Sequence, residues 1–161
     1  MKPKIELLCL DVDGVLTDTR VFMDSDGDWK RLYSIRDGVG IVELRKAGFK
    51  TAIITGSEAE DVRSRAKRLK FDYFFEGALD KQPAFEELMK QSGLKPEQIA
   101  YCGDDIYDIP LLEQVGWATT VPDAVDEVKS AAHYVTKRPG GLGAVREICD
   151  ILRKDLVDDY R

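Results

Sequence analysis

The sequence has no long apolar run, few cysteines and no excess of positive charge. No stretch approaches the roughly 18 apolar residues of a membrane helix, and residues 1–4 lead into an apolar run that Asp11 ends too early for a secretion signal. The three cysteines lack CxxC spacing and are odd in number, which predicts reduced thiols in the cytoplasm. The net charge of −6, without a basic patch, argues against a nucleic-acid partner. We therefore expect a cytoplasmic protein that binds neither membrane nor nucleic acid.

Strand-like and helix-like segments alternate along the chain, which predicts an α/β fold. We expect a Rossmann-like parallel sheet with helices on both faces, and one domain over residues 1–161. Two β-rich runs flank the Asp/Gly-rich residues 24–28 and predict a small hairpin with a solvated acidic tip. The expected strands are 5–10, 51–54, 73–75, 99–102, 117–121 and 134–135, and the expected helices are 37–47, 59–69, 83–91, 110–115, 124–131 and 142–156.

Asp11 and Asp13 stand where the first predicted strand ends. In an open α/β sheet, ligands bind at the carboxyl ends of strands, so both carboxylates would point into a crevice. Two carboxylates at such a short distance repel each other unless a cation lies between them. A hard divalent ion such as Mg²⁺ binds such oxygens and keeps part of its shell for water and phosphate. The loop does not fit a calcium-binding EF-hand, because Gly14 stands fourth rather than sixth in it.

Three further groups of polar residues occur later in the chain, each at or near the end of a predicted strand or the start of a helix. Thr55 and Gly56 end the second strand, Lys81 precedes a helix, and Asp104 follows another strand with Asp105 and Asp108 close behind. Taken singly, each fits a turn, an exposed helix start or a helix cap. Their joint order favours a phosphate site. His133, the one histidine, and Trp117 are expected to be structural.

With these four positions, the chain resembles the phosphatases among the haloacid dehalogenase-like hydrolases. That family carries an Asp-x-Asp loop, a Ser/Thr after the second strand, a Lys and a paired-acid loop, and the resemblance covers essentially the whole chain. Asp11 would attack phosphorus to give an aspartyl-phosphate, and Asp13 would protonate the leaving alkoxide and then deprotonate water.

The resemblance also implies the remaining site residues. Mg²⁺ would be held by Asp11, Asp104 and the backbone carbonyl of Asp13, with Asp105 and Asp108 as further ligands or as residues that orient the ligands. The phosphate would be held by a further set: Gly14, Thr55, Gly56 and Lys81.

The gaps between these motifs hold no segment large enough for a cap domain. Among such capless relatives, the chain is similar to the bacterial 3-deoxy-D-manno-octulosonate 8-phosphate phosphatases, in the segments 11–18, 36–41, 103–105 and 140–147. This implies a phosphatase of lipopolysaccharide precursor synthesis. It also implies a homotetramer whose hairpins form a central barrel and in which a neighbour's tail covers the site. Arg138, Gly140 and Gly141 would then contact the neighbour's substrate, although a flexible loop before the last helix fits residues 139–141 as well.

One position departs from this group. The octulosonate enzymes often have arginine after the second-motif glycine, whereas this chain has Ser57. A substrate carboxylate could instead be bound by Arg63, Arg65 or Arg68, of which we select Arg65, although these residues also fit a solvated helix face. The alternative substrate is a nine-carbon nonulosonate 9-phosphate.

A function of another class is a phospho-accepting receiver domain, which also uses aspartates, Mg²⁺, a Thr/Ser and a Lys on a parallel sheet. A receiver carries its acceptor at the end of the third strand. Here the predicted nucleophile ends the first strand and has Asp13 beside it. The sequence therefore favours an enzyme.

Overall fold

The computed structural model describes residues 4–161. Residues 1–3 lie outside the described part of the chain. They belong to the expected domain 1–161 and to the N-terminal start in which we expect no secretion signal.

Six parallel strands form the central sheet, in the order β5-β4-β1-β6-β7-β8. The core strands are short and apolar, and all four residues of β1 are buried, as expected for a parallel sheet that is covered on both faces. Their bounds are β1 Leu7–Leu10, β4 Lys50–Ile54, β5 Tyr73–Phe75, β6 Ile99–Cys102, β7 Trp117–Thr120 and β8 Tyr134–Val135.

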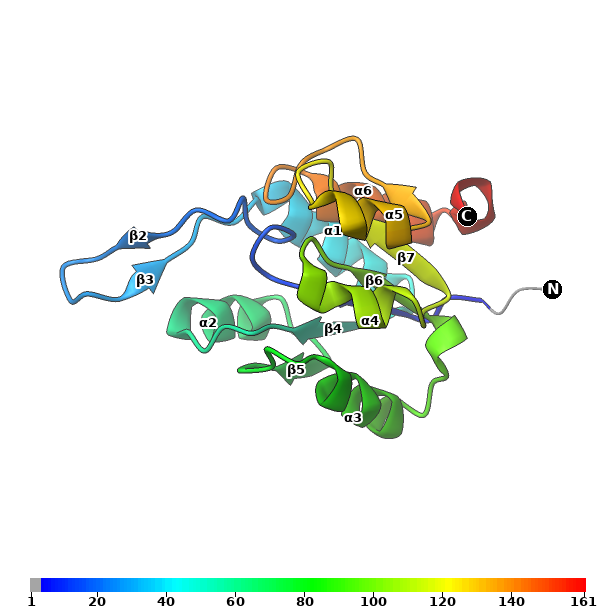
Figure 1. Ribbon diagram of the computed structural model, residues 1–161, viewed down its shortest axis with the longest axis horizontal. Helices are drawn as coiled ribbons and strands as arrows, with labels where there is room; N and C mark the ends of the chain where they lie inside the picture. The colour runs from blue at the N-terminus through cyan, green and yellow to red at the C-terminus, as the bar shows by residue number, and fades with distance from the viewer. Residues whose placement is uncertain (1–3) are drawn as a thin grey trace.

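Helices cover both faces of this sheet (Figure 1). On one face α1 packs against α6, and α2 approaches α1 closely where the space above Gly38 is filled by Arg65 and Leu69. On the other face α4 packs against both α3 and α5. The helices are α1 Ile35–Lys46, α2 Glu60–Arg68, α3 Gln82–Ser92, α4 Ile109–Leu112, α5 Asp126–Ala131 and α6 Ala144–Arg153. Three 3₁₀ turns, η1 Pro96–Gln98, η2 Ile106–Asp108 and η3 Val157–Tyr160, complete the described elements.

A small antiparallel hairpin, β2 Phe22–Met23 and β3 Trp29–Lys30, extends away from the sheet (Figure 1). Its turn is closed by Asp24, whose carboxylate accepts hydrogen bonds from the backbone N–H groups of Asp26 and Asp28. The expected fold is confirmed: an α/β parallel sheet with helices on both faces, a small hairpin and, in the described residues, no cap inserted between the motifs.

The largest differences from the expected boundaries occur at two helices. The predicted helix 110–115 is the short α4, which ends at Leu112 with Glu113 as its C-cap. The turn η2 precedes it and begins behind Asp105, whose side chain accepts from the N–H of Ile106. The last helix ends at Arg153, before Asp155 adopts a left-handed backbone (φ 56°). His133 and Trp117 have the expected structural roles: His133 Nδ1 accepts from the N–H of Ala118, and Trp117 is fully buried. Among the described residues, no helix has both the length and the apolar character that a membrane span requires.

Candidate active site

The predicted site residues meet where the central strands end. The parallel register pairs Leu10 with both Ile53 and Cys102. The residues after β1, β4 and β6 therefore lie at one edge of the sheet. A cavity of about 230 Å³ at this edge is lined by eight of the predicted residues: Asp11, Asp13, Thr55, Gly56, Lys81, Asp104, Asp105 and Asp108.

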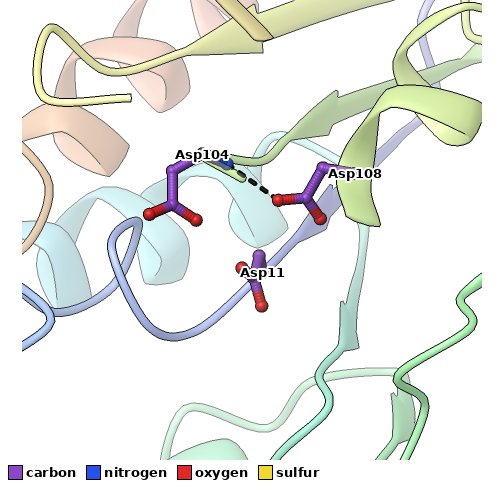
Figure 2. Close-up of side chains that lie close together, drawn as sticks. All are labelled: Asp11, Asp104 and Asp108. Carbon is purple, nitrogen blue, oxygen red and sulfur yellow. Dashed lines mark hydrogen bonds between the residues drawn. The ribbon is translucent and has the colours of Figure 1, made fainter. Parts of the chain in front are cut away.

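Asp11, Asp104 and Asp108 point toward one another across this cavity (Figure 2), and their nearest carboxylate oxygens lie within 4.8 Å. Burial raises the pKa of Asp11 to about 6, and the charge of Asp108 adds to the shift while Lys81 opposes it. Burial also raises the pKa of Asp104 to about 8, with further contributions from the charges of Asp11 and Asp108. The site thus concentrates negative charge that the protein compensates only in part.

Lys81 is the buried cation of the site. It is 5% exposed, contrary to an ordinary helix-start lysine, and its Nζ lies 3.1 Å from Asp11 Oδ1 and 2.5 Å from Asp108 Oδ1. Burial lowers the pKa of Lys81, but the charges of Asp11 and Asp108 outweigh burial and leave the pKa above its usual value. Lys81 therefore stays charged beside Asp11.

Asp108 holds Lys81 in place. Its Oδ1 accepts from Lys81 Nζ and, at 2.6 Å, from the hydroxyl of Tyr101. Its Oδ2 accepts from the backbone N–H groups of Asp104 and Asp105. Each oxygen thus has two donors within the protein, which suits a residue that orients the site better than a direct metal ligand. Asp105 is exposed and caps η2.

Asp13 also lines the cavity, but its partners differ from those of Asp11 and Asp108. Its carboxylate binds Arg31, with Nε 2.7 Å from Oδ1 and Nη2 3.1 Å from Oδ2. Thr17 adds a hydrogen bond from Oγ1 to Oδ1 at 3.2 Å. The Asp13 side chain is still 38% exposed, so one side of it remains open to a substrate.

The predicted phosphate-binding residues have the geometry that close approach requires. Gly14 has a left-handed backbone (φ 89°), and a Cβ there would collide with the Asp104 carboxylate. Thr55 is buried, and its hydroxyl accepts from the N–H of Ser57, so its proton is free for a phosphoryl oxygen. Gly56 lines the cavity beside it.

The two arginines predicted to bind the substrate, Arg65 and Arg138, do not line this cavity in their own chain. Arg65 donates to the carbonyl of Ser34 and stacks over the ring of Tyr33, with its Cζ 5.2 Å from the centroid. Arg138 lines another cavity, beside α6.

The glycines next to Arg138 contact their own chain. The N–H of Gly141 donates to the carbonyl of Val15, and Gly140 packs on the backbone of Gly14. The loop 139–141 therefore packs against the residues that directly follow Asp13.

The sequence did not identify three residues that organise the site: Arg31, Asp61 and Tyr101. Arg31 stands in a run that reads as an exposed strand of the hairpin, and Tyr101 reads as a core residue of β6.

The donor set fits a hard divalent cation. Asp11 and Asp104 supply carboxylate oxygens that repel each other without a cation, and such oxygens are the ligands that Mg²⁺ prefers. Burial is the main cause of the raised pKa of both side chains; the charge of Asp108 adds to the shift of Asp11, and the charges of Asp11 and Asp108 add to the shift of Asp104. These two residues would hold the ion directly, and Asp108 would fix their surroundings.

Binding of Mg²⁺ should release protons. Near pH 7 the Asp104 carboxyl, with a pKa of about 8, is mostly protonated in the metal-free protein and must ionise to bind the ion. We expect release of about one proton per ion at about pH 7 and an affinity that rises with pH up to about pH 8, then levels off. Calorimetry in two buffers of different ionisation enthalpy measures this. Equal heats in both buffers, with an affinity independent of pH, would contradict it.

Comparison with known proteins was made on both sequence and structure. The family model of the haloacid dehalogenase-like hydrolases matches residues 74–147. The chain is 42% identical to the 3-deoxy-D-manno-octulosonate 8-phosphate phosphatase KdsC of Yersinia pestis over 148 residues, which is 92% of this chain and 79% of the relative.

Solved structures give the same result. A 3-deoxy-D-manno-octulosonate 8-phosphate phosphatase from Moraxella catarrhalis, in complex with magnesium, phosphate and KDO, superposes with a TM-score of 0.90 at 34% identity, covering 97% of this chain and 91% of that one. The cobalt-bound phosphatase of Haemophilus influenzae also has a TM-score of 0.90, at 38% identity, covering 94% of this chain and 88% of that one.

Proposed function

Because the chain belongs to the haloacid dehalogenase-like hydrolases, in the family of the 3-deoxy-D-manno-octulosonate 8-phosphate phosphatases, we propose that it hydrolyses this sugar phosphate with Mg²⁺. We propose that this reaction belongs to lipopolysaccharide precursor synthesis and takes place in the cytoplasm. The observation that carries the proposal is the meeting of Asp11, Asp104 and Lys81 at one edge of the sheet. A phosphate monoester is dianionic, so its hydrolysis requires positive charge beside a positioned nucleophile; Lys81 lies next to Asp11, and the carboxylates of Asp11 and Asp104 would hold Mg²⁺ there.

In the first step Asp11 attacks phosphorus. A carboxylate oxygen of Asp11 forms the new bond to phosphorus, and the bond from phosphorus to the sugar oxygen breaks. Asp13 gives its proton to that oxygen, so that the sugar acid leaves as an alcohol rather than as an alkoxide. The open side of the Asp13 carboxyl faces the cavity where this oxygen would lie.

In the second step water attacks the aspartyl-phosphate. Asp13, now ionised, takes the proton from the water, and the bond between phosphorus and Asp11 breaks to release inorganic phosphate. Each residue is thereby returned to its starting state.

The remaining residues hold the phosphoryl group. Lys81 supplies a buried positive charge beside Asp11, and Thr55 and the Gly56 amide donate hydrogen bonds to the phosphoryl oxygens. Asp11, Asp104 and the Asp13 carbonyl would hold Mg²⁺, which would neutralise charge between the carboxylates and the phosphate.

A substrate panel tests the proposal. Purified protein with Mg²⁺ should hydrolyse 3-deoxy-D-manno-octulosonate 8-phosphate with a kcat/KM at least about tenfold above that for a nine-carbon nonulosonate 9-phosphate, a difference of about 1.4 kcal/mol in transition-state binding. A strong preference for the nine-carbon substrate would select the alternative. A single stoichiometric phosphorylation without turnover would indicate a receiver domain.

Assembly into a homotetramer belongs to the same proposal. The hairpin exposes Phe22, Met23 and Trp29, each more than half accessible, and the start of α1 exposes Ile35 at 83%. An isolated two-stranded hairpin is at best marginally stable in water, and a contiguous apolar surface marks a protein contact. Copies of the same hairpin would bury these side chains against one another.

Charge on the hairpin should separate the subunits. We expect Trp29→Asp to lower the mass observed by sedimentation velocity from tetramer to smaller species, because the carboxylate would be buried unpaired. Asp26→Asn, at the exposed tip of the same hairpin, serves as the control and should remain tetrameric. A wild-type protein that sediments as a monomer would refute the assembly.

In such a tetramer Arg65 and Arg138 would act on a neighbouring subunit. Both lie outside the cavity of their own chain, so a role in binding the substrate carboxylate requires that they reach the cavity of another copy.

A further inference from the structure

The guanidinium group of Arg31 contacts three residues at the active-site edge: Asp13, Ser57 and Asp61. It follows β3 on the returning arm of the hairpin, and its side chain is only 2% exposed. Nε and Nη2 contact the two oxygens of Asp13 at 2.7 and 3.1 Å. Nη2 also donates to Ser57 Oγ at 2.8 Å, and Nη1 donates to Asp61 Oδ1 at 3.1 Å.

Asp61 fixes Arg31 from the other side. Located in the first turn of α2, it accepts the Arg31 guanidinium on Oδ1 and the Arg31 backbone N–H on Oδ2 at 2.9 Å. Backbone and side chain of Arg31 are thus held by one carboxylate. A guanidinium carries its donors in a rigid planar fork, so with Asp61 and Ser57 on one side, the position of the remaining donors toward Asp13 is determined.

These contacts constrain the side chain of Asp13, which donates and accepts the proton in the proposed reaction. A two-point contact fixes both the position and the rotation of the Asp13 carboxyl group, which a single hydrogen bond would not do. Proton transfer needs the carboxyl oxygen within hydrogen-bond reach of the leaving oxygen, and small misplacements of a catalytic group are costly in rate.

From this geometry we infer that Arg31 is a positioning residue for proton transfer by Asp13, anchored in turn by Asp61. The inference rests on the phosphatase function proposed above. It assigns Arg31 no contact with the phosphoryl group, and it makes the hairpin stem part of the catalytic framework. A purely structural role, in which Arg31 only ties the hairpin to α2, would leave the dependence of the reaction on its leaving group unchanged.

The test compares two substrates that differ in their need for an acid. A sugar phosphate releases an alkoxide that must be protonated, whereas p-nitrophenyl phosphate releases a stable phenolate. With Mg²⁺ present, Arg31→Gln should lower kcat/KM for 3-deoxy-D-manno-octulosonate 8-phosphate by about 10- to 100-fold, part of the effect of a general acid. The loss on p-nitrophenyl phosphate should be less than about threefold in kcat/KM. Because Asp13 also activates water, the variant should show a stoichiometric burst of p-nitrophenol before a slower steady state.

Three further variants separate the roles. Adding Arg31→Gln to Asp13→Asn should cost less than about twofold on the sugar phosphate, since both changes act on one step. Asp61→Asn should give a smaller loss with the same substrate dependence, which covers the case in which Arg31→Gln does not fold. Lys30→Gln, a change in the neighbouring hairpin residue whose Nζ lies 3.4 Å from Asp24, should leave both rates unchanged.

The outcomes distinguish this inference from the function on which it rests. A wild-type protein that hydrolyses neither substrate would refute the phosphatase function itself. An active wild type with equal losses of kcat/KM on both substrates in Arg31→Gln and Asp61→Asn, or a full additional loss in the Asp13→Asn background, would refute the positioning role alone. Full activity of Arg31→Gln on the sugar phosphate would also refute it.

Discussion

Replacing Asp11 with asparagine should abolish turnover and leave the fold intact. The amide has no charge with which to attack phosphorus, so we expect kcat to fall by at least about 10⁴-fold. Stability should be unchanged or higher, because burial and the charge of Asp108 disfavour the ionised form of Asp11 and raise its pKa to about 6. Lys81 would still be paired with Asp108. Phosphate release and a thermal melt of the metal-free protein measure the two effects.

Asp126→Asn is the matched control for this change. Its side chain is 99% exposed and pairs only loosely with Lys129 at the surface of α5, so activity and melting temperature should both match those of the wild type. An Asp11→Asn protein that retains measurable steady turnover would rule out the covalent route through this residue.

Replacing Asp108 with alanine should cost both stability and activity. Four donors would lose their acceptor: the Lys81 ammonium, the Tyr101 hydroxyl and the N–H groups of Asp104 and Asp105. Removing one partner of a buried ion pair costs about 3–5 kcal/mol, and we expect a loss of this size in the free energy of unfolding. Lys81 would also be free to turn toward Asp11 alone, which should lower kcat. Guanidinium unfolding of the metal-free protein gives the stability change.

Asp105→Ala tests whether the effect belongs to this buried network. Asp105 lies three residues earlier, is exposed and accepts only local backbone N–H groups within η2, so its loss should cost about 1 kcal/mol. Similar losses in the two variants would show that the helix start, and not the contact with Lys81, accounts for the stability.

The strands and the first acids could be predicted from the sequence because their signals are local. Short apolar runs that end in acids or glycine predict β1 and β6, and the predicted bounds of β5, β6 and β8 match those in the structure. Boundaries were less accurate around α4, which ends at Leu112 rather than at residue 115, and the 3₁₀ turn that Asp105 caps just before it was not predicted. Capping geometry depends on a side-chain rotation that the order of residues does not specify.

The roles of Asp108 and Arg31 could not be predicted for a different reason. Asp108 fitted a cap, a ligand or a residue that orients ligands equally well, and the choice depends on Tyr101 and Lys81 approaching from β6 and from the start of α3. Arg31 is separated from Asp13 by 18 residues and from Asp61 by 30, and its direction depends on how the hairpin leaves the sheet. Neither contact follows from spacing.

The sequence by itself determined that carboxylates, a threonine and a lysine would gather at one edge, because parallel strands bring their carboxyl ends together whatever the helices do. Only the tertiary structure decided which partner each of these groups has. Packing in three dimensions buries Lys81 between Asp11 and Asp108 and turns Arg31 inward against Asp13. Such contacts join elements far apart along the chain, and their geometry exists only once the sheet, α2 and the hairpin have packed together.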